Sequence, residues 1–238
     1  MAAWSSAFSA HTNIITVKMV QNGIRQEGVS TLLKTGLANC KSLQVLDLQD
    51  NTFTASAART LADVVGRWTS LRELGVGDCL LSARGGVMLG EALAAGKNKS
   101  LRVLRLQYNE IDAKGVAALS RAAASGSALP ELQRVELNGN KFDEDGEELE
   151  KLREVLEKRR EEAGADEEDE EWGVDELDDL EEESEDEDGE EDEEEEEEEA
   201  EEERVLKEAD QAEEENVAQE KDSSVDALAD LMGKTELK

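Results

Sequence analysis

Ten positions that recur at regular spacing carry residues able to contact a partner protein. Five lie inside short apolar patterns: Lys18, Asp47, Gly75, Arg105 and Glu136. Five lie in the turns that follow: Gln21, Asp50, Asp78, Tyr108 and Asn138. Charges of both signs predominate, which favours a polar interface steered by electrostatic attraction. Tyr108 stands out because aromatic side chains are frequent at binding hot spots, whereas the alternative for any single position is an ordinary solvated sheet face.

The chain shows no set of residues typical of catalysis or metal binding. His11 is the only histidine, which excludes His-based triads and His-rich metal sites. The sequence has neither a G-x-x-x-x-G-K-[ST] motif nor a strand-embedded G-x-G-x-x-G, the usual nucleotide cradles. Its acidic runs lack the fixed ligand offsets and the glycine of an EF-hand. We therefore interpret the chain as a binding protein with no catalytic residue, cofactor or metal of its own.

These positions are set by a five-fold pattern, L-x-x-L-x-L-x-x-N/C-x-L, which identifies leucine-rich repeats. Its Asn or Cys positions, here called the ladder residues, are Asn22, Asn51, Cys79, Asn109 and Asn140. Successive ladder residues are 29, 28, 30 and 31 residues apart. We expect them to be structural, because a buried amide can satisfy backbone groups that a turn leaves unpaired.

Each strand pattern is followed by a segment with helical spacing of its apolar residues, such as Val116 and Leu119. A small residue stands six positions after each ladder residue, where it lets a helix approach its neighbour. Each repeat is thus predicted to be a strand, a turn, a helix and a return loop. Stacked repeats of this kind give an α/β solenoid of the ribonuclease-inhibitor-like type, with a parallel sheet on the concave face.

The chain consists of two parts that differ strongly in net charge. Residues 1–141 contain 16 Lys and Arg against 11 Asp and Glu, and residues 142–238 contain 10 against 50. We predict leucine-rich repeats over 1–141, a C-terminal repeat helix and cap over 142–163, and a disordered acidic tail over 164–238. Two segments of mixed apolar and acidic residues, 172–180 and 224–232, interrupt the tail, and each is either a short docking motif or an inert part of it.

The first repeat is predicted to be incomplete. Residues 3–11 have the pattern of the helical half of a repeat, with Trp4 and Phe8 one turn apart, but no strand pattern precedes them. The expected explanations are a shortened product, or a first face covered by a partner or by self-association.

The sequence favours a soluble intracellular protein. No apolar stretch has the length needed to span a bilayer, and the first residues do not resemble a signal peptide. Cys40 and Cys79 fall in different parts of their repeats, so we expect two reduced thiols.

The turn sequences carry a family resemblance. Segments 19–25, 46–53, 78–85, 104–111 and 136–140 closely resemble the later repeats of the fungal Ran GTPase-activating proteins, and the acidic residues from Asp175 to Asp179 are similar to that family's tail. The resemblance implies a protein that binds the GTP-bound form of the small GTPase Ran and accelerates GTP hydrolysis in nucleocytoplasmic transport. It implies a cytoplasmic protein, with the nuclear envelope or a partial location in the nucleus as the other options.

In that family an activator positions the catalytic glutamine of the GTPase, so the activator itself is not the enzyme. The Arg and Asn credited with this role lie in early repeats, which we expect this chain to lack. We therefore assign no catalytic residue and expect little or no acceleration of hydrolysis by the 238-residue chain.

The sequence leaves two other functions open. In the first alternative the chain is a leucine-rich-repeat scaffold or inhibitor without GTPase-activating activity. In the second alternative the acidic tail is the functional part and binds basic proteins. The charge of the tail disfavours nucleic acid as a partner.

Overall fold

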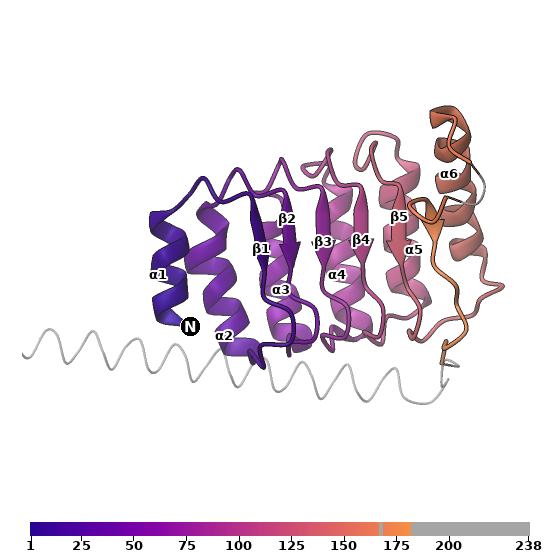
Figure 1. The fold of residues 1–238 in the computed structure, drawn as a ribbon. Coiled ribbons are helices and arrows are strands. Elements are labelled where there is room, and N and C mark those ends of the chain that lie inside the picture. The colour runs from indigo at the N-terminus through magenta and orange to yellow at the C-terminus, as the bar shows by residue number, and fades with distance from the viewer. Residues whose placement is uncertain (167–168, 182–238) are drawn as a thin grey trace, which may run out of the picture. The chain divides into compact units, whose positions relative to one another are not determined.

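A parallel sheet of six short strands runs through the part of the chain that the structure describes. The computed structural model describes residues 1–166 and 169–181. All of them belong to one compact unit, Met1–Glu185, and a second unit covers Asp186–Lys238. The strands pair in chain order (Figure 1) and are β1 (Thr16–Lys18), β2 (Val45–Asp47), β3 (Glu73–Gly75), β4 (Val103–Arg105), β5 (Arg134–Glu136) and β6 (Gly173–Val174).

A row of helices lies along one side of this sheet (Figure 1). They are α1 (Ala2–Ala10), α2 (Gln26–Thr31), α3 (Thr54–Val65), α4 (Ser82–Ala94), α5 (Ala113–Ala124) and α6 (Glu147–Ala163). A π-helical turn at Leu32–Gly36 and a 3₁₀ turn at Leu37–Asn39 extend α2. The predicted solenoid of strand, turn and helix is confirmed.

The apolar positions of the strand pattern form the core. At the centres of β2, β3 and β4, Leu46, Leu74 and Leu104 are paired in register and completely buried. Behind them Trp68 is also completely buried, and its indole nitrogen donates a hydrogen bond to the Leu37 carbonyl oxygen at 2.8 Å. Burying this continuous apolar layer between sheet and helices is the main favourable contribution to folding.

Small residues at the helix starts allow the close packing that the sequence predicts. A Cβ atom added at Gly85 would lie 2.8 Å from the Cβ of Ala58 on the preceding helix. At the start of α5, Asp112 accepts a hydrogen bond from the Gly115 backbone nitrogen at 2.8 Å, which caps the helix.

The last long helix, α6, closes the predicted repeats. Leu149, Leu152 and Leu156 face the core, and the helix ends at Gly164 with φ +70°, a conformation that glycine adopts without strain. From the same helix, Arg159 donates hydrogen bonds to the carbonyl oxygens of Leu132, before β5, and of Ala123 on α5. No helix in the described ranges is long and apolar enough to cross a membrane.

The predicted boundary of the disordered tail at residue 164 is wrong for residues 169–181. These residues continue the fold: β6 pairs with β5, and Leu177 is 9% exposed. Val174 and Leu180 pack against the same core. The reason is that these apolar residues bury against the last repeat, which outweighs the acidic composition around them. The remainder of the predicted tail, with segment 224–232, lies outside the described residues.

Candidate protein-binding surface

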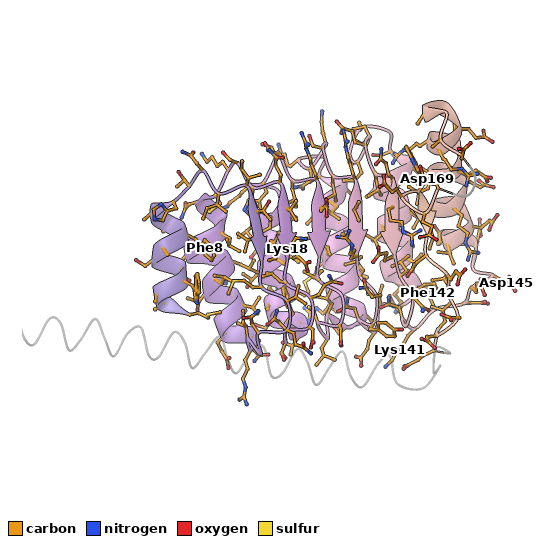
Figure 2. The ribbon with its side chains drawn as sticks, in the orientation of Figure 1. Phe8, Lys18, Lys141, Phe142, Asp145 and Asp169 are labelled. Atoms are coloured by element: carbon orange, nitrogen blue, oxygen red, sulfur yellow. The ribbon has the colours of Figure 1, made fainter. Side chains whose placement is uncertain are left out.

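The five predicted strand residues form one row across the sheet. Strand register pairs Lys18 with Asp47, Asp47 with Gly75, and so on to Arg105 and Glu136. Lys18 is exposed at the end of β1 (Figure 2). Since the pattern alternates, the neighbours of each in the strand point into the core.

Charges in this row are largely matched within the sheet. Arg105 lies 3.3 Å from a Glu73 oxygen and 3.5 Å from a Glu136 oxygen. Arg134 lies 3.9 Å from Glu136. The β3–β5 part of the surface is therefore a network of alternating charge, which favours partners with a complementary pattern over partners of one charge.

Asp47 corrects the expectation that every residue of the row is free to meet a partner. It is only 8% exposed, because Gln49 folds back and donates from its side-chain nitrogen to Asp47 Oδ1 at 3.0 Å. Gln107 in turn donates to Gln49 at 2.7 Å, across the side-chain-free Gly77. The polar chain from Asp47 to Gln107 thus covers this part of the sheet.

Four predicted turn residues share an unusual backbone conformation. Gln21, Asp50, Asp78 and Tyr108 have φ angles of +56°, +55°, +51° and +55°. Such left-handed angles are uncommon for residues other than glycine. Each stands directly before a ladder residue.

The fifth predicted turn residue, Asn138, is shifted by one position. The residue before the ladder Asn140 is Gly139, with φ +69°. Asn138 instead accepts the backbone hydrogen bond of Tyr108 at 2.9 Å, as Gln107 does for Asp78 at 2.8 Å. Asn138 therefore corresponds to Gln107, and Gly139 holds the turn position that the sequence-based prediction assigned to Asn138. The prediction is wrong by one residue because Asn and Gly are both common in turns.

Three ladder residues are buried and fully hydrogen-bonded. The Asn109 amide oxygen accepts from the Cys79 and Leu81 nitrogens at 3.0 and 3.3 Å, and its amide nitrogen donates to Val76 and Leu106 carbonyl oxygens at 2.8 and 2.9 Å. Asn140 makes the equivalent bonds one repeat further on. Asn51 accepts from the Ile24 nitrogen at 3.0 Å and donates to Leu48. These three side chains hold consecutive turns together.

The other two ladder residues act differently. Cys79 Sγ lies 3.4 Å from the Leu48 oxygen and 3.3 Å from the Gly77 oxygen, and burial raises the pKa of its thiol from 9.0 to about 12. Cys40 is also a buried free thiol, as expected. Asn22 is exposed, and among the described residues its side chain bonds only locally, to the Val20 oxygen at 2.8 Å.

Residues 172–181, here called the strap, cover the last two turns of this surface. The Asp175 carboxylate accepts from the Leu137 and Asn138 nitrogens at 2.7 and 3.1 Å. The Asn138 side chain donates to Asp178 at 2.8 Å and accepts from the Asp179 nitrogen at 2.9 Å.

Sequence reasoning missed these strap contacts. The available signal was the mixture of apolar and acidic residues in 172–180, and it did not reveal where the segment binds.

The described residues include no candidate metal site. Among them, no three His, Cys, Asp or Glu side chains are grouped so that they could hold a metal ion. The surface has charged and amide side chains and one exposed aromatic ring, which suit the binding of a protein.

A comparison with protein families matches the leucine-rich-repeat model to residues 39–62 and 97–120. The matched segments run along two of the strand, turn and helix units described above. The chain forms a leucine-rich-repeat solenoid.

A relative of this leucine-rich-repeat chain is Ran GTPase-activating protein 1 of Saccharomyces cerevisiae, which is 42% identical over 137 residues. The aligned region covers 57% of this chain and 34% of the yeast protein, so the chain spans about a third of the length of its relative. The resemblance to Ran GTPase-activating proteins predicted from the turn sequences is confirmed.

Proposed function

We propose that this chain is a Ran GTPase-activating protein or a fragment of one, and that it binds the GTP-bound form of Ran in nucleocytoplasmic transport. The observation that carries the proposal is the 42% identity to yeast Ran GTPase-activating protein 1 over 137 residues. The aligned region covers 57% of this chain. The activity of the whole relative comes to this chain as a proposal, because the chain spans only part of it.

The solenoid supports this role as a rigid, charged docking surface. Its acidic turn residues Asp50 and Asp78 are held in fixed backbone conformations beside the matched charges of the strand row. Complementary charges accelerate encounter with a partner and fix its orientation. A rigid surface of this kind suits an activator that orients a GTPase.

In this proposal the partner performs the chemistry. Activation of a GTPase arises mainly from positioning and electrostatic stabilisation of its own reacting groups. No residue in 1–166 or 169–181 is assigned a catalytic role. Binding of the GTP-bound partner is therefore the property expected of this surface, and acceleration of hydrolysis is measured separately.

The test is binding of the 238-residue chain to Ran loaded with GTP or with GDP. We expect clear preference for the GTP form, and equal binding of both forms would contradict the proposal. Replacing Asp50 and Asp78 by Asn removes two turn charges while keeping a side chain that tolerates positive φ, and should weaken binding. The matched control replaces Asp63 and Glu91, on the helices, by Asn and Gln.

Single-turnover GTP hydrolysis by Ran at saturating protein then separates activation from binding alone. Little or no acceleration is the result that the sequence predicts, and acceleration close to that of a full-length relative would contradict it. The relative's name does not favour the scaffold alternative. A cytoplasmic location, at the nuclear envelope or partly nuclear, belongs to the same proposal. Binding of basic proteins by the acidic residues 182–238 stays a prediction, because these residues lie outside the described ranges.

A further inference from the structure

Tyr108 lies across the turn of the next repeat. A Cβ atom added at Gly139 would stand 2.1 Å from Cδ1 and 2.3 Å from Cε1 of the Tyr108 ring. Any larger residue at position 139 would displace the ring, and φ +69° at this position also favours glycine. The Tyr108 ring can therefore occupy this position only because residue 139 is a glycine.

The strap holds the far end of the same side chain. The Tyr108 hydroxyl donates to Asp179 Oδ2 at 2.9 Å. Asp179 is itself fixed by the hydrogen bond from its backbone nitrogen to Asn138, and the Asp175 carboxylate anchors the strap to the Leu137 nitrogen directly after β5. Ring and hydroxyl are thus both restrained, although the residue is 45% exposed.

We propose that Tyr108, Gly139 and Asp179 form a latch that presents the open face of the Tyr108 ring, already oriented, to a Lys or Arg side chain of the GTP-bound partner. This inference rests on the proposed function and deepens it. An aromatic face beside carboxylates attracts a cation both through the ring and through charge. Restraining the ring before binding lowers the entropy lost on association.

The latch can be observed without any partner, because Tyr108 is the only tyrosine of the chain. Its hydrogen bond to Asp179, and then the charges of Asp179, Asp178 and Asp175, raise the pKa of Tyr108. A pH titration of phenolate absorbance should therefore show a lower pKa in Asp179→Ala. Glu176→Ala, which removes the same charge from an exposed position of the strap, should change the pKa much less. Equal titration curves for the chain and Asp179→Ala would overturn the latch.

Binding to GTP-loaded Ran tests what the latch does. Tyr108→Phe keeps the ring but loses the hydroxyl, so Tyr108→Phe and Asp179→Ala should each weaken binding about threefold. The double variant should be no weaker than Asp179→Ala, because the hydrogen bond that Tyr108→Phe removes is already lost in that variant. Tyr108→Ala should weaken binding about tenfold or more, since the ring itself is lost.

Two results would overturn the docking role: an additive double variant, or tighter binding after loss of the latch. The second would mean that the strap blocks the ring. If the unmodified chain does not bind GTP-loaded Ran, the proposed function and the docking role fail together, while the absorbance titration still decides whether the latch exists.

Discussion

Asn109 joins two neighbouring turns through a single side chain. Its amide satisfies backbone groups of the third and fourth repeats, and its own backbone nitrogen donates to Asn140. Asn22 has the same place in the pattern but bonds only to its own turn. The same residue type therefore contributes differently according to its burial.

We expect Asn109→Ala to lower the free energy of unfolding by about 2–4 kcal/mol, because several buried donors and acceptors lose their partners. Asn22→Ala should cost less than about 0.5 kcal/mol, as is usual for an exposed position. Urea unfolding followed by circular dichroism measures both. Equal losses would show that the ladder bonds do not stabilise the fold.

Cys79 makes stability depend on alkaline pH. Its pKa is 9.0 ordinarily and about 12 when folded, so between these values the folded chain keeps a proton that the unfolded chain has lost. Stability from this group is fully present below pH 9 and is lost as pH rises toward 12. The loss should approach about 1.4 kcal/mol per pH unit. Unfolding curves at several alkaline pH values should show a steeper decline for the unmodified chain than for Cys79→Ala, and parallel declines would contradict this assignment.

The strap is the element that departs most from its sequence-based expectation. Its two-residue strand β6 adds to the sheet, and its apolar side chains cover the end of the last repeat. A composition dominated by acidic residues predicted disorder here. Burial of Leu177 and the paired backbone of β6 provide the compensating free energy.

A chain ending at residue 181 should consequently be more stable than one ending at residue 164. We expect a difference of about 2–4 kcal/mol, because the shorter chain exposes the apolar end of the solenoid and unpairs β5. Far-ultraviolet circular dichroism during urea unfolding is the appropriate measurement, since the shorter chain lacks Trp172. Identical midpoints would show that the strap contributes nothing to the fold.

At the scale of the whole chain, charge separates two kinds of binding. The repeats carry charges of both signs, whereas residues 182–238 belong to the strongly acidic part of the sequence. Binding to a cationic protein should therefore depend on the second part and fall steeply with salt. Binding to GTP-loaded Ran should depend on the first part.

Deleting residues 182–238, which hold 29 of the 61 Asp and Glu residues, should strongly weaken binding to polylysine and preserve binding to GTP-loaded Ran. The deletion must begin at 182, because a deletion from 164 also removes the strap. Both interactions are measured by titration calorimetry at low and physiological salt. Undiminished polylysine binding would assign it to residues 1–181.

The sequence by itself determined the solenoid, its strand register and the ladder residues Asn51, Asn109 and Asn140. Stacked repeats contact only their neighbours, so a spacing of 28–31 residues predicts which residues of adjacent strands lie side by side. The repeat period alone therefore suffices to place Lys18, Asp47 and Arg105 in one row.

Only the tertiary structure decided which of these residues remain accessible and where the strap binds. Asp47 is covered by a neighbouring Gln, and Tyr108 meets Asp179, which is 71 residues away in the chain. Neither contact follows the repeat period. Side-chain reach and the burial of a few apolar residues on the last repeat set these contacts, and both depend on three-dimensional packing that no local pattern encodes.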